Sequence, residues 1–148
     1  MAITKQKKCL IIIKPDAYER GLVGEIISRI ERTGLRISKI MSCHPTGEQL
    51  ELHYNHLTPD IVNEIKRYMI HPVYPLIVMT VCGYNAIAVC RKIVGATEPV
   101  NADAGTIRGD FGCESFDSIA PSAIHNLAHA SDSEENAARE EGIWFCQS

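Results

Sequence analysis

Two histidines near the C-terminal end, His125 and His129, stand four positions apart in the stretch HNLAHASDS. A small residue, then Ser131 and Asp132, follow His129, and Ser and Asp commonly cap helix N-termini. Backbone amides at such a terminus attract anions, so an imidazole there could meet a phosphoryl group. A structural histidine with one satisfied hydrogen bond is the alternative. The two histidines do not form a zincin pattern, because Asn-Leu-Ala separates them and no Glu follows the first.

Cationic and hydroxyl side chains that could bind phosphate are spread along the rest of the chain. Arg108 lies between glycines in GTIRGDFG, where a guanidinium and exposed backbone amides can contact phosphate oxygens, although a solvent-exposed arginine in a tight turn is equally possible. Lys14 follows the apolar run KCLIII, and Arg91 and Thr97 flank the start of a long loop. Each is either a phosphate ligand or a solvated surface group. The two standard nucleotide fingerprints, GxxxxGK[ST] and GxGxxG, are absent.

The N-terminal third predicts a strand, a helix and a second strand. Residues 8–13 (KCLIII) hold five consecutive apolar residues after Lys8, three of them successive isoleucines, which predicts a central strand buried on both faces. Residues 21–34 place apolar side chains at helical spacing and end on a glycine, as in an amphipathic helix. Residues 35–44 alternate imperfectly, which suits a strand exposed on one side.

The middle of the chain predicts a helical hairpin followed by a strand and a helix. Thr46 is placed to cap the first helix of the hairpin, and Pro59 to open the second. Residues 76–82, LIVMTVC, form the next β-branched apolar run, and residues 84–95 predict the helix after it.

The last third predicts a long functional loop over residues 95–124, which are rich in Gly, Pro, Asp and Ser. A strand over residues 123–129 and a helix over residues 131–145, capped by Ser131 or Asp132, complete the chain. This order predicts an α+β fold of the ferredoxin-like kind, an antiparallel sheet with flanking helices, as a single domain over residues 1–148.

Composition limits the classes of function. A chain of 148 residues with 45% hydrophobic content suits one packed core, and a net charge of −3 without a long cationic run argues against a principal nucleic-acid role. The apolar stretch before Lys14 is too short for a secretion signal or a membrane span, so a cytoplasmic protein is expected. The six cysteines never form CxxC, which indicates buried thiols in a reducing compartment.

The sequence closely resembles the nucleoside diphosphate kinase family. Five stretches occur in that family's order and approximate spacing: IIIKPDAYERGLVGEIISRIE, ELHY, CRKIVGATEP, GTIRGDFG and NLAHASDSEENAARE. The resemblance covers residues 8 to about 145, and the NxxH[GA]SD phrase is highly specific to the family.

The resemblance implies transfer of a γ-phosphoryl group from a nucleoside triphosphate to a nucleoside diphosphate, by a ping-pong reaction through a phosphohistidine. His129 matches the nucleophile and Glu140 the residue that orients its ring, with Ser131 linking the two. Lys14 matches the lysine that meets the transferred phosphoryl, and Tyr54 the tyrosine close to it.

The remaining matched residues bind the nucleotide in the family. Arg91, Thr97 and Arg108 match residues that hold the diphosphate, and Asn126 the residue that meets the ribose 3′-hydroxyl. Mg²⁺ would be carried by the nucleotide, largely through water, so no metal-binding residues of the protein's own are expected. The family also implies a homo-oligomer, a hexamer or a tetramer built on a dimer.

Four departures from the family pattern modify these expectations. Asp60 and Ile61 occupy the neighbourhood where the family stacks the base on a phenylalanine, so Ile61 is expected to give weaker stacking. The loop over residues 112–125 is longer than usual, which affects substrate access and assembly. Ala130 replaces a common glycine with little expected effect, and the end at Ser148 suggests a smaller or looser oligomer. The alternative is a catalytically weak relative that binds nucleotides or proteins.

Overall fold

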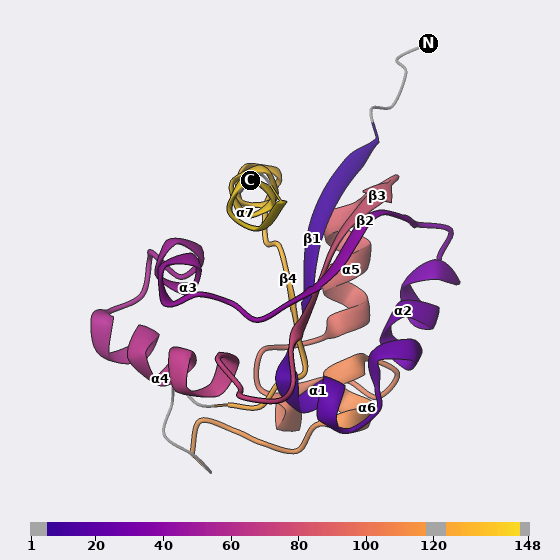
Figure 1. Cartoon of the computed structure of the whole chain (residues 1–148). Helices are drawn as coiled ribbons and strands as arrows, with labels where there is room; N and C mark the ends of the chain where they lie inside the picture. Colours follow the sequence, from indigo (N-terminus) through magenta and orange to yellow (C-terminus); the bar gives the residue numbers. More distant parts are fainter. Residues whose placement is uncertain (1–5, 118–123, 146–148) are drawn as a thin grey trace.

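The computed structural model of the chain describes residues 6–117 and 124–145. In chain order the elements are β1 (Lys7–Ile13), α1 (Pro15–Glu19), α2 (Val23–Glu31), β2 (Arg36–Cys43), α3 (Gly47–His53), α4 (Pro59–Met69), β3 (Leu76–Gly83), α5 (Ala86–Val94), η1 (Pro99–Asn101), α6 (Ile107–Phe111), β4 (Ala128–Ala130) and α7 (Glu134–Phe145) (Figure 1).

The four strands form one antiparallel sheet in the order β2-β3-β1-β4, which confirms the predicted ferredoxin-like topology. β1 is an inner strand, as its isoleucines predict, because a strand covered on both faces must be apolar on both. β2 is an outer strand and is largely exposed, as its imperfect alternation predicts.

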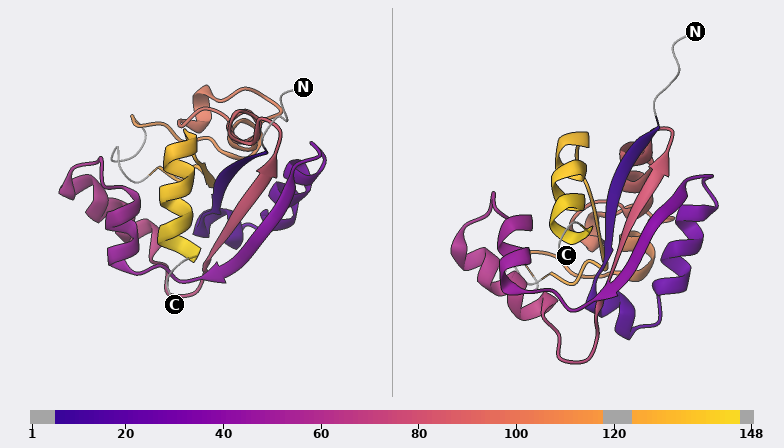
Figure 2. Two further views of the ribbon diagram at one scale, coloured as in Figure 1. Left: turned by 90° about the horizontal axis from the view of Figure 1, so that it is seen from above. Right: turned by 45° about the horizontal axis from the view of Figure 1, so that its top comes forward.

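Alternate side chains of β1 contribute to two separate hydrophobic layers. Cys9, Ile11 and Ile13 pack with residues of α2 and α5 on one face of the sheet. Leu10 and Ile12 pack with residues of α3, α4 and α7 on the other face. Figures 1 and 2 show these two groups of helices on opposite sides of the sheet. Because side chains alternate along a strand, the apolar stretch of β1 supports both layers at once.

Two predicted helix starts are confirmed, and the cap of α7 is corrected. Thr46 forms a capping box with Gln49 at the start of α3, and Pro59 is the first residue of α4. The cap of α7 is neither Ser131 nor Asp132 but Ser133, whose Oγ accepts the backbone N–H of Asn136 at 3.0 Å. Ser131 is unavailable because its backbone N–H and its hydroxyl both bond the backbone of β1.

The predicted loop over residues 95–124 contains two short helices, η1 and α6. Thr106 caps α6 by accepting the N–H of Gly109 at 3.0 Å, a local signal too short to give helical periodicity. The five-residue helix α1 was not expected for the same reason. The part of the loop at residues 118–123 lies outside the described residues.

The last strand is shorter than predicted. Pairing with β1 is confined to residues 128–130, because Leu127 has a φ of 73° and cannot continue an extended strand.

The cysteines are only partly as predicted. Cys9, Cys82 and Cys90 are buried, whereas Cys43 is half-buried and Cys113 is exposed. Cys146 lies outside the described residues.

Across the described stretches, 6–117 and 124–145, no helix is both long and apolar enough to cross a membrane.

Candidate active site

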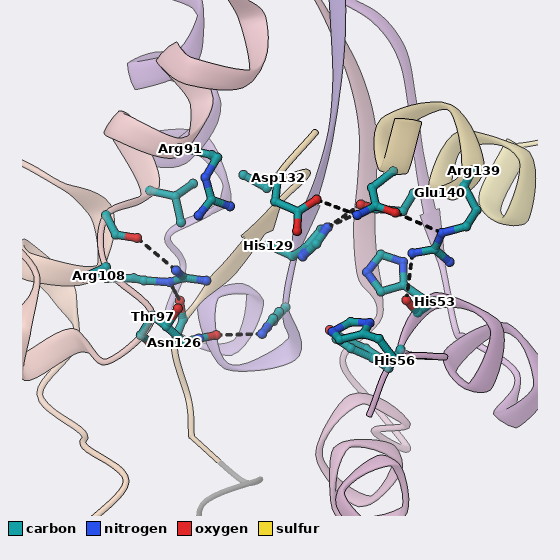
Figure 3. A pocket seen from close by; sticks show the side chains of 17 residues that line it. His53, His56, Arg91, Thr97, Arg108, Asn126, His129, Asp132, Arg139 and Glu140 are labelled. Atoms are coloured by element: carbon teal, nitrogen blue, oxygen red, sulfur yellow. Dashed lines mark hydrogen bonds and ion pairs between the residues drawn. The ribbon is translucent and has the colours of Figure 1, made fainter. Parts of the chain in front are cut away.

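A cavity of about 600 Å³ opens beside the end of β1, between α3, α5, β4 and α7 (Figure 3). Its lining includes most of the residues singled out from the sequence: Lys14, Tyr54, Arg91, Thr97, Arg108, Asn126, His129 and Glu140. Two others lie apart from it. Ser131 is fully buried behind Glu140, and Ile61 is a half-buried residue of α4 that does not line the cavity.

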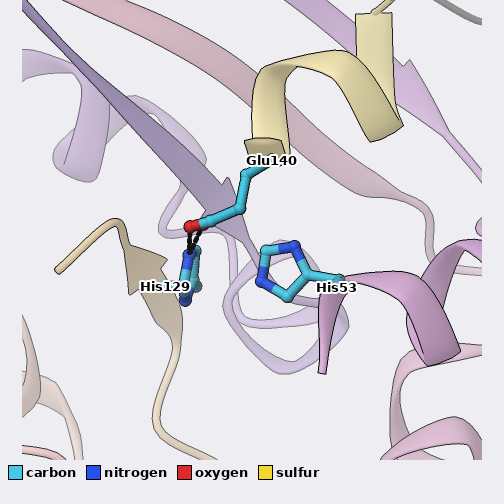
Figure 4. A group of neighbouring side chains, drawn as sticks. All are labelled: His53, His129 and Glu140. Carbon is cyan, nitrogen blue, oxygen red and sulfur yellow. Dashed lines mark hydrogen bonds and ion pairs between the residues drawn. The ribbon is translucent and has the colours of Figure 1, made fainter. Parts of the chain in front are cut away.

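His129 owes its position to the register of β4. It pairs with Ile12 of β1, and paired residues of neighbouring strands direct their side chains to the same face, here the face covered by α7. Glu140 of α7 meets it there, with both carboxylate oxygens 3.0 Å from Nε2 of the imidazole (Figure 4). Because the carboxylate is an acceptor, Nε2 carries the proton and Nδ1 keeps its lone pair. The ring therefore has a free nucleophilic nitrogen in the cavity.

The surroundings of His129 keep the ring neutral. Burial and the charges of Lys14 and Arg108 lower the pKa of His129 to about 3. Glu140 is itself only 2% exposed, and burial raises the pKa of its carboxyl group. The 3.0 Å contact with Glu140 opposes the lowering at His129. Burial and the two cations outweigh that contact, so the imidazole is unprotonated at Nδ1 at neutral pH.

Ser131 bonds mainly to the backbone of Leu10. Its Oγ accepts the N–H of Leu10 at 2.9 Å, while the carboxylate of Glu140 lies 3.5 Å away. The longer contact is a weak hydrogen bond at most. Ser131 therefore fixes the strand behind Glu140 more than it orients the carboxylate.

Lys14 and Asn126 are bonded to each other inside the cavity. The Nζ of Lys14 donates to Oδ1 of Asn126 at 2.6 Å, and Nδ2 of Asn126 donates to the carbonyl of Thr97 at 3.1 Å. Burial, and next the charge of Arg108, lower the pKa of Lys14 to about 7, which Asp16 partly offsets. Among the residues that the structure describes, no carboxylate contacts the buried Lys14 ammonium directly, a setting that favours an incoming anion.

Arg108 holds three backbone carbonyls around the cavity. Its Nε, Nη1 and Nη2 donate to the carbonyls of Asn126, Gly95 and Ala128 at 3.0, 3.0 and 2.5 Å. A guanidinium has five N–H groups, so two remain for a ligand. Burial lowers the pKa of Arg108 to about 10, which leaves it charged at neutral pH.

Known proteins with similar sequences and structures share one family. The family model described as nucleoside diphosphate kinase matches residues 7–148. The chain is 44% identical over 146 residues to the nucleoside diphosphate kinase of Pyrococcus abyssi, covering 98% of this chain and 87% of that protein. It is 43% identical over 141 residues to the enzyme of Corynebacterium diphtheriae, covering 94% and 96%. The chain belongs to the nucleoside diphosphate kinase family.

Solved structures of the same family have the same fold. One is a transition-state mimic of the nucleoside diphosphate kinase from Borrelia burgdorferi with bound vanadate and ADP, with a TM-score of 0.87 and 36% identity over 95% of this chain and 87% of that one. Another is a nucleoside diphosphate kinase from Pyrobaculum aerophilum, with a TM-score of 0.85 and 33% identity over 95% and 96%.

His53 is a residue of the cavity that the sequence analysis did not single out. Its ring lies edge-on to His129 with the centroids 4.5 Å apart, and the indole Nε1 of Trp144 donates to its Nδ1 at 3.0 Å. An indole can only donate, so neutral His53 carries its proton on Nε2, which points toward His129 (Figure 4). Burial and the neighbouring His129 hold the pKa of His53 well below its usual range. A lone histidine in a helix gives no signal of this arrangement.

Arg139 joins the two helices that carry His53 and Glu140. Its Nη1 and Nη2 donate to the carbonyls of Leu52 and His53 at 2.7 and 3.2 Å, at the C-terminal end of α3. This cation satisfies carbonyls that a helix end leaves unpaired. The sequence did not reveal it, because the partners lie 86 and 87 positions away.

The cavity offers little to a resident Mg²⁺. Within the described ranges, His53, His129 and Glu140 have donor atoms within 4.8 Å of one another. Two imidazoles suit transition metals better than Mg²⁺, and the proton on Nε2 of His53 blocks its lone pair. Asp132 is an exposed carboxylate of the same lining.

The backbone just before β4 is held in an unfavourable conformation. Leu127 is fully buried with a φ of 73°, and the N–H of Ala128 donates to the carbonyl of Asn126 at 2.8 Å across it. This three-residue γ-turn is rare for a residue other than glycine and costs about 1–3 kcal/mol. The turn lies directly between Asn126 and the strand that carries His129.

Proposed function

We propose that this chain performs the reaction of its family through a phosphohistidine on Nδ1 of His129. The observation that carries the proposal is the bond from Nε2–H of His129 to Glu140, because it leaves Nδ1 as the free nucleophilic nitrogen in a cationic cavity. The relative with bound vanadate and ADP supports this, since vanadate mimics a phosphoryl group in transfer.

The reaction has two balanced halves. In the first, the Nδ1 lone pair of His129 attacks the γ-phosphorus of a nucleoside triphosphate, and the bond from that phosphorus to the β-phosphate oxygen breaks. The nucleoside diphosphate leaves with the bonding electron pair. In the second, a terminal oxygen of another nucleoside diphosphate attacks the phosphorus and the N–P bond breaks, which restores neutral His129. Glu140 stabilises the positive charge on the phosphorylated ring in both halves.

The surrounding residues supply position and charge. Lys14 and the two remaining N–H groups of Arg108 stabilise the oxygens of the transferred phosphoryl group, and Tyr54 lies beside it. Burial raises the pKa of Tyr54, so its hydroxyl stays protonated and can donate. Arg91 and Thr97 are exposed on the rim and bind the diphosphate.

The nucleoside is bound outside this cationic centre. Asn126 meets the ribose 3′-hydroxyl once the anionic phosphate draws Lys14 away from its Oδ1. Ile61 contacts the base only if the base extends beyond the cavity over α4.

Mg²⁺ enters with the nucleotide. It would supply positive charge to the phosphates of the nucleotide, and Asp132 would hold it through one of its waters.

The chain as a whole is proposed to form one domain over residues 1–148. We also propose a cytoplasmic location, which agrees with the free thiols of Cys9, Cys82 and Cys90. Assembly into a homo-oligomer, a hexamer or tetramer built on a dimer, follows from the family resemblance.

Intact mass measured at alkaline pH tests the reaction. Incubation with Mg²⁺ and GTP should add one phosphoryl group, and CDP should remove it with formation of CTP. His129→Ala should take up none and still bind nucleotide. His44→Ala is the matched control, because His44 is an exposed residue that does not line the cavity and its loss should leave phosphorylation intact. A folded wild-type chain that binds GTP and gains no mass would instead indicate a nucleotide-binding relative without transfer.

A further inference from the structure

Asp16 bridges three parts of the chain from the first turn of α1. Its Oδ2 accepts the backbone N–H of Leu127 at 3.2 Å, and its Oδ1 accepts the hydroxyl of Tyr68 in a short hydrogen bond. It does not line the cavity that contains His129. None of the roles proposed above uses this carboxylate.

The residue that Asp16 holds is the strained one. Leu127 occupies the γ-turn between Asn126 and β4, with a φ that a leucine rarely adopts. The turn has two further restraints, since the N–H of Lys14 donates to the Leu127 carbonyl at 2.9 Å and Nε of Arg108 donates to the Asn126 carbonyl at 3.0 Å. Asp16 provides the only side-chain acceptor for the Leu127 N–H within the described residues. An unfavourable backbone conformation persists only when its surroundings hold it.

Tyr68 fixes the direction of this carboxylate. The tyrosine comes from α4, and its ring lies edge-on to His125 at a centroid distance of 4.6 Å. Burial and the adjacent Asp16 raise the pKa of Tyr68, so its O–H remains a donor at neutral pH. The carboxylate therefore has one oxygen bound to α4 and the other directed at the turn.

We propose that Asp16 is a positioning residue for phosphoryl transfer, which sets the aim of His129 by holding the γ-turn at Leu127. This inference rests on the proposed function and deepens it. His129 directly follows the turn, two residues beyond Leu127, so a relaxation of Leu127 displaces the imidazole relative to the phosphate that Lys14 and Arg108 hold. In-line attack depends steeply on such placement. Asn126, on the other side of the turn, shifts with it.

The charge of Asp16 must be separated from its geometry, because that charge also acts on Lys14. Asp16→Asn retains a carbonyl oxygen for the Leu127 N–H and can donate its amide to the Tyr68 oxygen. Asp16→Ala removes both bonds. Tyr68→Phe removes only the bond that orients the carboxylate. Across the three variants, the side chain at position 16 therefore keeps both of its hydrogen bonds, loses one of them, or loses both.

The test is a quenched-flow measurement of His129 phosphorylation by saturating GTP and Mg²⁺, which gives both a rate constant and a final stoichiometry. Asp16→Ala should lower the rate constant by about 10²-fold while each folded chain still takes up one phosphoryl group. Asp16→Asn should stay within about threefold of wild type, and Tyr68→Phe should fall between the two.

Three results would overturn the proposal. A wild-type rate constant in Asp16→Ala would show that the turn needs no such support. A reduced stoichiometry at an unchanged rate constant would show a role in folding alone. An Asn variant as slow as the Ala variant would assign the effect to charge. Asp16→Ser replaces the Ala variant if that one does not fold. A wild-type chain that is not phosphorylated would refute the proposed function itself, a distinct outcome.

Discussion

The attack on the nucleotide depends on the protonation states of two side chains, His129 and Lys14. Burial lowers the pKa of both. For His129 the neutral form is the reactive one, so a lowered pKa keeps it reactive toward acid pH. For Lys14 the charged form is the useful one, so a lowered pKa makes its charge vulnerable toward alkaline pH. The two pKa shifts therefore move the pH range in which His129 is neutral and Lys14 is charged toward acid pH.

The two pKa shifts predict the pH dependence of kcat/KM for the nucleoside triphosphate. With a pKa of about 3, His129 gains no proton down to about pH 5, and Lys14 is almost fully charged below about pH 6, so kcat/KM should be level between about pH 5 and 6. Lys14, with a pKa of about 7, loses its charge as the pH rises through that value, so kcat/KM should fall on the alkaline side. Steady-state rates at low GTP concentration from pH 5 to 10 measure both limbs.

Lys14→Arg is the control for the alkaline limb. Arginine stays charged throughout, so the fall near pH 7 should vanish in this variant even if the absolute rate is lower. An alkaline fall that persists with arginine would assign the limb to another group.

Motifs identified the residues that carry the proposed chemistry, but not those that support them. His129, Glu140 and Lys14 stand in phrases whose residue order is itself specific. His53 and Asp16 have roles that depend on partners far along the chain, Trp144 and Leu127, which spacing in one sequence cannot reveal. The strained φ of Leu127 could not be expected either, because leucine carries no preference for it.

At the scale of elements, α3 and α7 must hold a fixed separation for His53 and Glu140 to flank His129. Two side chains of α7 set it: Trp144 by its bond to His53, and Arg139 by its bonds to the end of α3. Both helices also contribute to the same hydrophobic layer. The polar bonds therefore add orientation to a contact that apolar burial already stabilises.

Loss of the Arg139 hydrogen bonds should lower the free energy of unfolding by a measurable amount. Arg139→Met keeps most of the aliphatic stem but leaves two helix-end carbonyls without their donor, so the free energy of unfolding should fall by about 1–3 kcal/mol. Arg139→Lys should recover part of it. Urea unfolding followed by circular dichroism gives these values.

A matched control is available on α4. Arg67 pairs with Glu64, three residues away, and its side chain is 77% exposed, so Arg67→Met should change stability by less than about 0.5 kcal/mol. Equal losses in the two variants would mean that Arg139 acts as an ordinary surface charge.

Elements with long apolar periodicity were predictable, and the short ones were not. β1, β3 and α2 were predictable because burial decides which positions are apolar along their whole length: nearly every position in the two strands, and one face of the helix. α1 and α6 have five residues each, too few to show a period, and the capping serine of α7 competes with two similar residues beside it. The register between β1 and β4 decides which of these three residues caps the helix, and that register is set by tertiary contacts.

At the scale of the whole molecule, β2 is an outer strand that, within the described residues, pairs along one side with β3 and carries exposed apolar surface. Ile40 on this strand is 54% exposed. Free strand edges readily pair with another chain unless charge or a covering element prevents it. In the proposed homo-oligomer we place a contact at this edge, antiparallel to the same strand of a second copy.

Ile40→Lys should disrupt that contact. A charge on the exposed strand of both copies would repel across a two-fold axis, so the mass in solution should fall toward the 16.4 kDa of one chain. Sedimentation equilibrium measures the mass directly. Val73→Lys, at a site 65% exposed in the connection between α4 and β3, should leave the assembly unchanged. Retention of the wild-type mass by Ile40→Lys would place the contact on another surface.

The order of the strands along the chain has a consequence for folding. Ile12 of β1 pairs with His129 of β4, so the imidazole reaches the cavity only when these two strands meet. Arg108 likewise finds its carbonyl partners at Asn126 and Ala128 only when that segment is in place. Closing the sheet then joins segments more than a hundred residues apart, the slow, entropically costly step expected of such a topology.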